Sequence, residues 1–397
     1  MSFNDRFFNN PLLPSHRTSA LHTKSAAQPL RNRLQHLFNQ ADIQIDGSRP
    51  WDIQVHDHRF FSRILAEGSM GLGESYMDGW WDGVALDELF YRIFRAHLDE
   101  QSLTWRDGLA ALQAKIVNHQ KISRAFQVGR HHYDLGNDLY EKMLDKRMIY
   151  SCGYWKDATS LDHAQEAKLD LICRKLQLEP SMRLLDIGCG WGGMAAYAAE
   201  NYGVEVVGIT VSKEQAQYAR EHCRGLPVTI ELKDYREQTG SFDRVISIGM
   251  FEHVGHKNYL TFMQHQRELL TDNGLALLHT IGRNKTGHTV DKWIGRYIFP
   301  NSMLPSARQI TTALEGTFVI EDWHSFGTDY DTTLMHWFRN FDRRFEQLRS
   351  AVYDQRFYRM WKYYLLSCAG SFRARRNQVW QIVLSPQGCL GGYQTTR

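Results

Sequence analysis

The sequence has no long apolar run, almost no excess charge and no clustered cysteines. Its most apolar pieces, such as Gly274–Leu278, have the length of a strand, whereas a spanning helix needs roughly 18 apolar residues in a row. The 47 Lys and Arg residues nearly balance the 44 Asp and Glu residues, which leaves a formal charge of +3 and argues against a polyanion-binding protein. We therefore expect a globular protein that does not cross a membrane and does not bind nucleic acid.

The six cysteines form no C-x-x-C pair and no cluster with histidines at zinc spacing. We expect reduced thiols that form no disulfide and bind no metal. The N-terminal residues contain no continuous apolar segment followed by a cleavage site, so a secretory signal is not expected. The predicted compartment is the cytoplasm.

The 397 residues divide into three predicted regions. Residues 1–28 are polar and mildly basic, and we expect a flexible lead-in. Residues 29–122 are expected to form a smaller accessory domain that helps lipid docking. Within it, glycines in the block 68–82 predict tight turns, and apolar residues at helical spacing predict a helix over 86–96. Residues 123–397 form the predicted catalytic domain.

In the third region, strand-sized apolar runs alternate with helical stretches. This alternation is typical of a mostly parallel sheet covered by helices. Asp162, followed three residues later by Gln165, predicts the start of one helix. The expected strands are 183–187, 204–209, 228–232, 244–248 and 275–279, and helices over 332–348 and 355–372 precede a last strand over 378–384. The predicted fold class is α/β, with a doubly wound, Rossmann-like sheet and a smaller N-terminal domain.

A glycine-rich loop follows the first of these strands. Gly188, Gly190 and Gly193 fit the G-x-G-x-x-G pattern of dinucleotide-binding proteins. The acid expected about 20 residues later for the ribose is missing, since the next strand ends at Thr210. Asp186 stands two residues before the first glycine, and a carboxylate there suits a cationic amino-acid group better than a pyrophosphate. We expect S-adenosylmethionine, with a dinucleotide or a purely structural loop as alternatives.

Four further polar segments, 150–155, 249–255, 279–282 and 329–335, follow strand ends or lie in loops. With them, the chain closely resembles the cyclopropane-fatty-acyl-phospholipid synthases, and its later part resembles the mycolic-acid cyclopropane synthases and methyltransferases. The motifs that carry the resemblance are, in order, GLGESYMDGWW, HHYDLGNDLY, YSCGYWKDA, LDIGCGWGG, GMFEHVGHKNY, LLHTIG, RYIFP, FGTDYDTTLMHW and CAGSFRAR. The resemblance covers most of the chain and implies the class I S-adenosylmethionine-dependent methyltransferase fold.

The resemblance implies transfer of a methylene group from S-adenosylmethionine to the cis double bond of unsaturated acyl chains in membrane phospholipids. An alkene that attacks the methyl group of a sulfonium becomes a carbocation, and ring closure then requires removal of one methyl proton. A protein carboxylate or thiolate against that carbon risks alkylation, so a small held base is safer. The resemblance implies bicarbonate as this base.

The resemblance also implies the ligands of the bicarbonate. They would be the backbone at Cys152 and Ile281 and the side chains of Glu252, His279 and Tyr330. His279 would position the anion, Tyr330 would hydrogen-bond to it, and Glu252 would orient it and accept its protons. Each of these side chains has a structural alternative, as a helix-terminus acid, a satisfied buried histidine or a core aromatic.

The residues that the resemblance places around S-adenosylmethionine come from several segments. They are Tyr150, Ser151, Asp186, Gly188, Cys189, Gly190, Gly192, Thr210, Gln215, Asp234 and Tyr235. Gln215 would contact the ribose, and Tyr235 would flank the adenine. The resemblance also points to Cys368 as an active-site group, but direct methyl transfer needs no thiol nucleophile, so we favour a packing role.

Aromatic side chains are candidates for the lining of an acyl channel, although core packing is their more common role. The candidates are Tyr133, Tyr154, Trp155, Phe251 and Trp293. Arginines around 339–344 and 372–376 predict a solvated face or, alternatively, attraction to an anionic bilayer surface.

The resemblance implies a homodimer associated peripherally with the inner face of the cytoplasmic membrane. Two alternatives remain at this point. One is a methyltransferase of the same superfamily that acts on a small amine or makes a methyl-branched lipid. The other is a catalytically silent lipid-binding protein.

Overall fold

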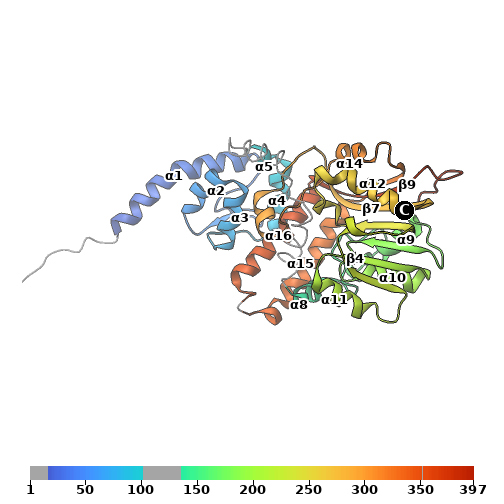
Figure 1. The fold of residues 1–397 in the computed structure, drawn as a ribbon. Helices are drawn as coiled ribbons and strands as arrows, with labels where there is room; N and C mark the ends of the chain where they lie inside the picture. The colour runs from blue at the N-terminus through green and yellow to red at the C-terminus, as the bar shows by residue number, and fades with distance from the viewer. Residues whose placement is uncertain (1–16, 102–135, 351) are drawn as a thin grey trace, which may run out of the picture.

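The computed structural model describes residues 17–101, 136–350 and 352–397. A helical region lies at one end and a sheet with its covering helices at the other, with α15 (Thr328–Leu348) and α16 (Gln355–Arg373) between them (Figure 1). Within the described ranges, none of the helices combines the length and apolarity that a membrane span requires. The predicted domain boundary at residues 122 and 123 and the channel candidate Tyr133 lie outside the described residues.

Seven strands form one sheet in the order β5-β4-β3-β6-β7-β9-β8. Their bounds are β3 Arg183–Ile187, β4 Glu205–Thr210, β5 Val228–Leu232, β6 Phe242–Ile248, β7 Leu270–Arg283, β8 Val319–Ser325 and β9 Asn377–Ser385. Strands β3 to β7 are parallel, and β9 is antiparallel to β7 and β8. The chain order reverses between β3 and β6, and open sheets of this kind bind ligands at such a point, beyond the carboxyl ends of the strands.

Alternating residues of the strands enter two separate cores. Leu184 of β3 packs with α9 (Leu161–Lys175) and α10 (Gly193–Tyr202). Leu185 packs on the opposite face with α12 (Tyr259–Leu269) and α14 (Ala307–Leu314). Because both faces of the sheet are covered, its central strands are apolar on both sides. The doubly wound α/β sheet predicted from the sequence is confirmed.

The remaining elements belong mainly to the N-terminal part. They are α1 Arg17–Asn39, β1 Gln54–Val55, α2 Arg59–Glu67, α3 Ser69–Met77, β2 Trp81–Asp82, α4 Leu86–Arg95, α5 Leu98–Gln101 and α8 Asn137–Met143, with α11 Lys213–His222 and α13 Lys292–Tyr297 later in the chain. Helix α4 confirms the helix expected over 86–96. Helix α1 begins at Arg17, inside the segment expected to be a lead-in.

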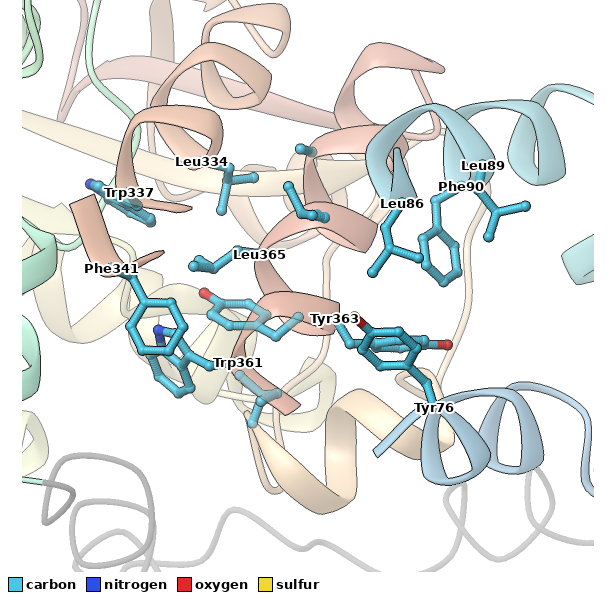
Figure 2. Close-up of a cluster of buried hydrophobic side chains, with 14 of the residues drawn as sticks. Tyr76, Leu86, Leu89, Phe90, Leu334, Trp337, Phe341, Trp361, Tyr363 and Leu365 are labelled. Atoms are coloured by element: carbon cyan, nitrogen blue, oxygen red, sulfur yellow. The ribbon is translucent and has the colours of Figure 1, made fainter. Parts of the chain in front are cut away.

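The N-terminal helices share one hydrophobic core with α15 and α16. Figure 2 shows α16 in the middle of this cluster, with Trp361 near Phe341 of α15 and Tyr363 near Tyr76 of α3 and Phe90 of α4. The rings of Phe90 and Tyr363 meet edge-on at 5.0 Å. Helix α16 therefore joins the N-terminal helices to the part of the molecule that carries the sheet.

The glycine-rich block at 68–82 is a helix over much of its length, which corrects the prediction of tight turns. Gly73 lies in α3, and a Cβ atom there would be 2.3 Å from Cδ1 of Trp293. The glycine thus permits close packing of α3 against α13. Gly68, with φ +59°, and Gly79, with φ +73°, occupy the turns before and after the helix, and there the predicted tight turns are confirmed.

Two further predictions at the level of elements were wrong. Ser160, and not Asp162, caps α9, because its side chain accepts a hydrogen bond from the backbone N–H of His163. Strand β8 was not predicted, since Asp322 is its only buried residue and the strand has no alternating apolar pattern.

Candidate active site

A pocket lies at the carboxyl ends of β3, β4 and β6, where the order of the strands reverses. Ten predicted donor-binding residues line it: Tyr150, Ser151, Asp186, Gly188, Cys189, Gly190, Thr210, Gln215, Asp234 and Tyr235. The eleventh, Gly192, is not among the lining residues. It has a φ of +85° before α10, and a Cβ atom there would be 3.0 Å from Sγ of Cys223. Its role is to let the loop turn closely against α11.

Asp186 provides a buried negative charge in the wall of this pocket. The residue is 2% exposed, and its Oδ2 has no hydrogen-bond partner among the described residues. Burial raises the pKa of the carboxyl group to about 7, and the charge of Lys168 opposes this rise. A buried carboxylate oxygen without a partner fits a cationic ligand group. The ammonium of S-adenosylmethionine is such a group.

The end of β4 and the start of α11 present two linked polar side chains. The Thr210 hydroxyl donates a hydrogen bond to Gln215 Oε1 over 3.0 Å. Ser212 caps α11 by accepting a hydrogen bond from the backbone N–H of Gln215 over 3.3 Å. Because Thr210 binds the carbonyl of the Gln215 side chain, the amide group of this side chain is oriented, and it can donate hydrogen bonds to ligand hydroxyls.

Asp234 and Tyr235 form another wall of the pocket. Arg236 binds both carboxylate oxygens of Asp234, over 2.8 and 2.7 Å. The ring of Tyr235 meets Phe262 edge-on at 5.1 Å, and burial raises the pKa of its hydroxyl to about 12. This neutral aromatic wall suits a flat, uncharged ring such as adenine.

Glu252 lies just beyond the pocket, in the turn after β6. Its neighbours Met250 and His253 line the pocket, whereas its own Oε1 accepts a hydrogen bond from the backbone N–H of Ile281 over 2.6 Å. Its Oε2 is buried and has no hydrogen-bond partner among the described residues. Burial raises the pKa of the carboxyl group to about 7. The group can therefore take up and release a proton near neutral pH.

His279 stands on β7 two residues before Ile281, on the same side of the strand. Its side chain is buried, which lowers the pKa of the imidazole well below its usual value, so the ring is neutral. Nδ1 lies 3.4 Å from Nε2 of Gln381. With Gln381 as the donor, the ring proton resides on Nε2, which can donate to an anion.

Cys152 and Tyr330 are brought into one region by α15. The backbone N–H of Gly153 donates to the Thr333 hydroxyl over 3.1 Å, and Thr333 lies about one turn after Tyr330. The Tyr330 ring meets Trp337 edge-on at 5.7 Å. The Cys152 thiol is fully buried, which raises its pKa well above the usual value, so it is neutral.

Cys368 lies on α16 and packs against the same apolar core as the N-terminal helices. Burial raises the pKa of its thiol to about 12. A thiol with that pKa is not ionised near neutral pH and is a poor nucleophile. The environment of Cys368 is that of a packing residue.

The channel candidates among the described residues do not share one environment. Phe251 stacks on Tyr259 at 4.1 Å in the core beneath α12. Trp293 is buried against α3 and α16 in the other core. Tyr154 and Trp155 are only partly buried and lie near α15.

Among the polar groups of the pocket that the sequence did not predict are Lys168, His253 and Arg236. A signal for Lys168 was present, because it falls on the apolar stripe of α9, between Ala164 and Ile172. Charged residues on such a stripe are almost never fully buried without a partner. The other two lie in short turns, where no periodic pattern exists.

Comparisons with known proteins show the family of the chain. The family model described as "Mycolic acid cyclopropane synthetase" matches residues 119–382. The cyclopropane-fatty-acyl-phospholipid synthase of Escherichia coli (strain K12) is 54% identical over 362 residues, which are 91% of this chain and 94% of the relative.

Solved structures match the sheet-bearing part. The cyclopropane synthase MmaA2 from Mycobacterium tuberculosis aligns with a TM-score of 0.61 and 31% identity, over 65% of this chain and 97% of that chain. The mycolic acid cyclopropane synthase CmaA1, solved with SAH and CTAB, aligns with a TM-score of 0.61 and 32% identity, over 65% and 97% of the two chains.

Proposed function

The chain belongs to the mycolic acid cyclopropane synthetase family, and we propose that the pocket and the buried groups beside Glu252 form its active site. The protein is an S-adenosylmethionine-dependent methyltransferase of the class I fold. It transfers a methylene group to the cis double bond of unsaturated phospholipid acyl chains and forms cyclopropane fatty acids. The observation that carries the site assignment is Glu252, whose carboxylate is buried, anchored through one oxygen and unpartnered at the other.

The donor site consists of the pocket at the strand ends. S-adenosylmethionine supplies an electrophilic methyl group on a sulfonium. Asp186 binds the ammonium of its amino-acid end, Gln215 binds the ribose hydroxyls, and Tyr235 packs against the adenine. Because these groups come from three separate strand ends of a rigid sheet, they orient the donor before the lipid arrives.

Bicarbonate fits the groups beside this pocket. The Oε2 of Glu252, which has no partner among the described residues, can accept a hydrogen bond from the anion, and the neutral imidazole of His279 can donate one to it. Tyr330 and the backbone at Cys152 complete the predicted ligand set, together with the backbone at Ile281, which already binds Glu252. A bicarbonate held there supplies a base too small and too weakly nucleophilic to be trapped by the methyl group.

The side chains of the site have separate roles in the removal of the proton. Glu252 can accept the proton that leaves the methyl carbon, because burial raises the pKa of its carboxyl group to about 7. His279 stays neutral and holds the anion without competing for that proton. The buried thiols of Cys152 and Cys368 stay protonated, so neither is alkylated by the donor.

The same set of groups separates the proposal from its alternatives. A methyltransferase that methylates a small amine removes a proton from nitrogen, and not from the transferred methyl carbon. A silent lipid-binding protein needs no unpartnered carboxylate beside its donor pocket. The buried Glu252 carboxylate favours ring formation over both.

The chain reaches its substrate as a peripheral protein on the inner face of the cytoplasmic membrane. Arg339, Arg343 and Arg344 are exposed on α15 and form no ion pair with an acid in the described part of the chain. They support a contact with an anionic bilayer surface. Arg373 and Arg376 are paired with acids instead, so we leave them out of this contact.

The homodimer and the division into residues 1–28, 29–122 and 123–397 also belong to the proposal. The homodimer follows from the resemblance, and the division follows from changes of composition and pattern along the chain. Sedimentation of the purified protein tests the dimer: a species of twice the 46.3 kDa chain mass is expected, and a monomer at working concentration contradicts it.

Glu252→Gln tests the site assignment. The variant keeps the shape of the side chain but cannot accept a proton, so we expect donor binding by calorimetry to stay unchanged while ring formation on unsaturated vesicles falls about 100-fold or more. Added bicarbonate should partly restore turnover in His279→Ala, where the anion is held less well.

The matched control is Glu268→Gln, because Glu268 is an exposed glutamate on α12. It should retain normal turnover. Wild-type turnover in Glu252→Gln, with cofactor binding intact, contradicts the assignment.

A further inference from the structure

Helix α9 carries two fully buried lysines with different surroundings. Lys168 and Lys175 are both 0% exposed. Lys175 forms an ion pair with Asp322 at 3.2 Å. Lys168 forms no ion pair within the described residues, and its one hydrogen bond there runs from Nζ to the Ser151 hydroxyl over 2.9 Å. A buried ammonium without an anionic partner is costly, which points to a partner that arrives with a ligand.

Lys168 is part of the wall of the donor pocket, together with Ser151 and Asp186. The carboxylates of Asp145 and Asp186 attract its charge, although burial has the larger effect and lowers the pKa of the ammonium to about 8. At this pKa the group is mostly charged at neutral pH. Of its three N–H donors, Ser151 accepts from one, so two remain available to bind a ligand.

The amino-acid end of S-adenosylmethionine carries a carboxylate beside its ammonium. Asp186, with its unpartnered Oδ2, offers a site for the ammonium only. The carboxylate needs a cation or several N–H donors when water is excluded. In the same wall, Lys168 presents two N–H donors and a positive charge.

We propose that Lys168 is a donor-binding residue that holds the carboxylate of the amino-acid end while Asp186 holds the ammonium. This inference rests on the donor site proposed above. The two residues then bind the oppositely charged groups of the zwitterion. The buried ammonium of Lys168 gains a carboxylate within hydrogen-bonding distance, which the described residues do not provide. Ligands that lack this end of the donor are not recognised by Lys168.

The same lysine links the donor site to the anion site. Gln165, about one turn before Lys168, donates to the backbone oxygen of Ser151 over 2.8 Å. Two side chains of α9 therefore hydrogen-bond to Ser151, which directly precedes Cys152 in the chain. Donor binding at Lys168 thus fixes the segment whose backbone is a predicted ligand of the bicarbonate.

Calorimetry with two probes tests the assignment. S-adenosylhomocysteine keeps the amino-acid end of the donor, whereas 5′-methylthioadenosine lacks it. In Lys168→Met we expect the affinity for S-adenosylhomocysteine to fall roughly 10- to 100-fold, as for loss of a charge-assisted hydrogen bond. The affinity for 5′-methylthioadenosine should change less than threefold. Lys168→Arg, which keeps the charge, should recover most of the preference for S-adenosylhomocysteine over 5′-methylthioadenosine. This variant also tests the assignment if Lys168→Met fails to fold.

Lys175→Met is the matched control, with the same substitution of a fully buried lysine on the same helix. It should lower the melting temperature, because Asp322 loses a partner, and leave both affinities unchanged. Equal losses for the two probes in Lys168→Met, or no loss for either, would overturn the proposal. A wild-type protein that binds neither probe would instead remove the donor site itself.

Discussion

Burial gives the two acids of the site similar acidity but different tasks. Both Asp186 and Glu252 have carboxyl pKa values raised to about 7 by loss of solvent. Asp186 faces the donor pocket, where a cation lowers its pKa again and keeps it ionised. Glu252 is held by the backbone N–H of Ile281 on β7. In the proposed site, Asp186 attracts the donor and Glu252 accepts a proton.

The affinity for the donor should depend on pH through Asp186. Below about pH 7 the free protein holds this carboxyl in its neutral form, which must lose a proton before it can bind the ammonium. The affinity for S-adenosylhomocysteine should therefore rise by up to about tenfold per pH unit as the pH approaches 7 from below, and level off above it.

Asp186→Asn tests this origin of the pH dependence. Calorimetry should show an affinity roughly 10- to 100-fold lower than that of the wild type above pH 7, because a charged hydrogen bond is lost, and a flat profile. The exposed Asp272→Asn serves as the control. A variant that keeps the wild-type slope would show that another group titrates.

Cys368 should be dispensable for the chemistry. Its thiol has a pKa of about 12 because it is buried, so it supplies no nucleophile near neutral pH. We expect Cys368→Ala to retain turnover within about threefold and to lose about 1 kcal/mol of stability through the smaller side chain. Turnover below one hundredth of wild type, in a variant that melts normally and binds the donor, would give the thiol a chemical role.

Among the elements, one glycine sets the distance between helix α4 of the N-terminal part and helix α16. A Cβ atom at Gly370 of α16 would lie 2.6 Å from the backbone oxygen of Asp87 and 2.7 Å from the backbone nitrogen of Tyr91, both in α4. Backbone atoms cannot move aside as a flexible side chain can. This contact therefore requires glycine.

Gly370→Ala should separate α16 from α4 and lower the free energy of unfolding by about 1–3 kcal/mol, as in other overpacked cores. Thermal melting followed by circular dichroism measures the loss. Gln355→Ala, at the exposed first residue of the same helix, controls for helix propensity. An unchanged melting temperature in Gly370→Ala would mean that the two helices do not pack as the structure has them.

The pattern of the sequence predicted the parallel strands well, because each is a short apolar run between turns. Strand β3 has the predicted bounds, and β4 and β6 differ by one or two residues. Strand β8 was not predicted, because its position at the edge of the sheet leaves most of its residues exposed or partly exposed and gives it no apolar pattern. The sequence predicts turns at the glycines of α3, because it cannot show that the Arg63 backbone at Gly71 and the Trp293 side chain at Gly73 occupy the space a side chain would need.

For the site, the motifs indicated the residues but not their contacts. The order of the motifs predicted which donor residues share a pocket, since strand ends meet at one edge of the sheet. It could not predict that Glu252 binds Ile281 or that Lys168 binds Ser151, because each pair depends on how separate segments pack.

Across the whole molecule, ion pairs connect the N-terminal helices to α15 and α16. Arg373 of α16 binds Asp87 of α4 at 2.8 Å and Asp331 of α15 at 2.9 Å. Arg376 binds Asp99 at 2.7 Å. The arginines for which the sequence left a solvated face and a bilayer contact open are thus divided. Arg373 and Arg376 join helices, whereas the exposed arginines of α15 form no ion pair among the described residues and belong to the proposed bilayer contact.

We expect the triple variant Arg339→Gln, Arg343→Gln, Arg344→Gln to bind anionic vesicles roughly 100-fold more weakly at low salt, since each basic side chain near such a surface contributes about 1 kcal/mol. Vesicle sedimentation measures this loss. The control is Arg220→Gln, Arg224→Gln, Arg308→Gln, which removes exposed arginines elsewhere. Binding by the wild type that does not weaken with salt would contradict an electrostatic contact.

In the proposed reaction, the transferred methyl group loses one hydrogen as the ring closes. Vesicles of unsaturated phospholipid can be incubated with the protein and a donor whose methyl group is fully deuterated, and the fatty-acid methyl esters are then analysed by mass spectrometry. We expect products that gain one CD₂ unit within a cyclopropane ring. Products that keep all three deuterium atoms, or acyl chains without any gain in mass, would contradict this expectation.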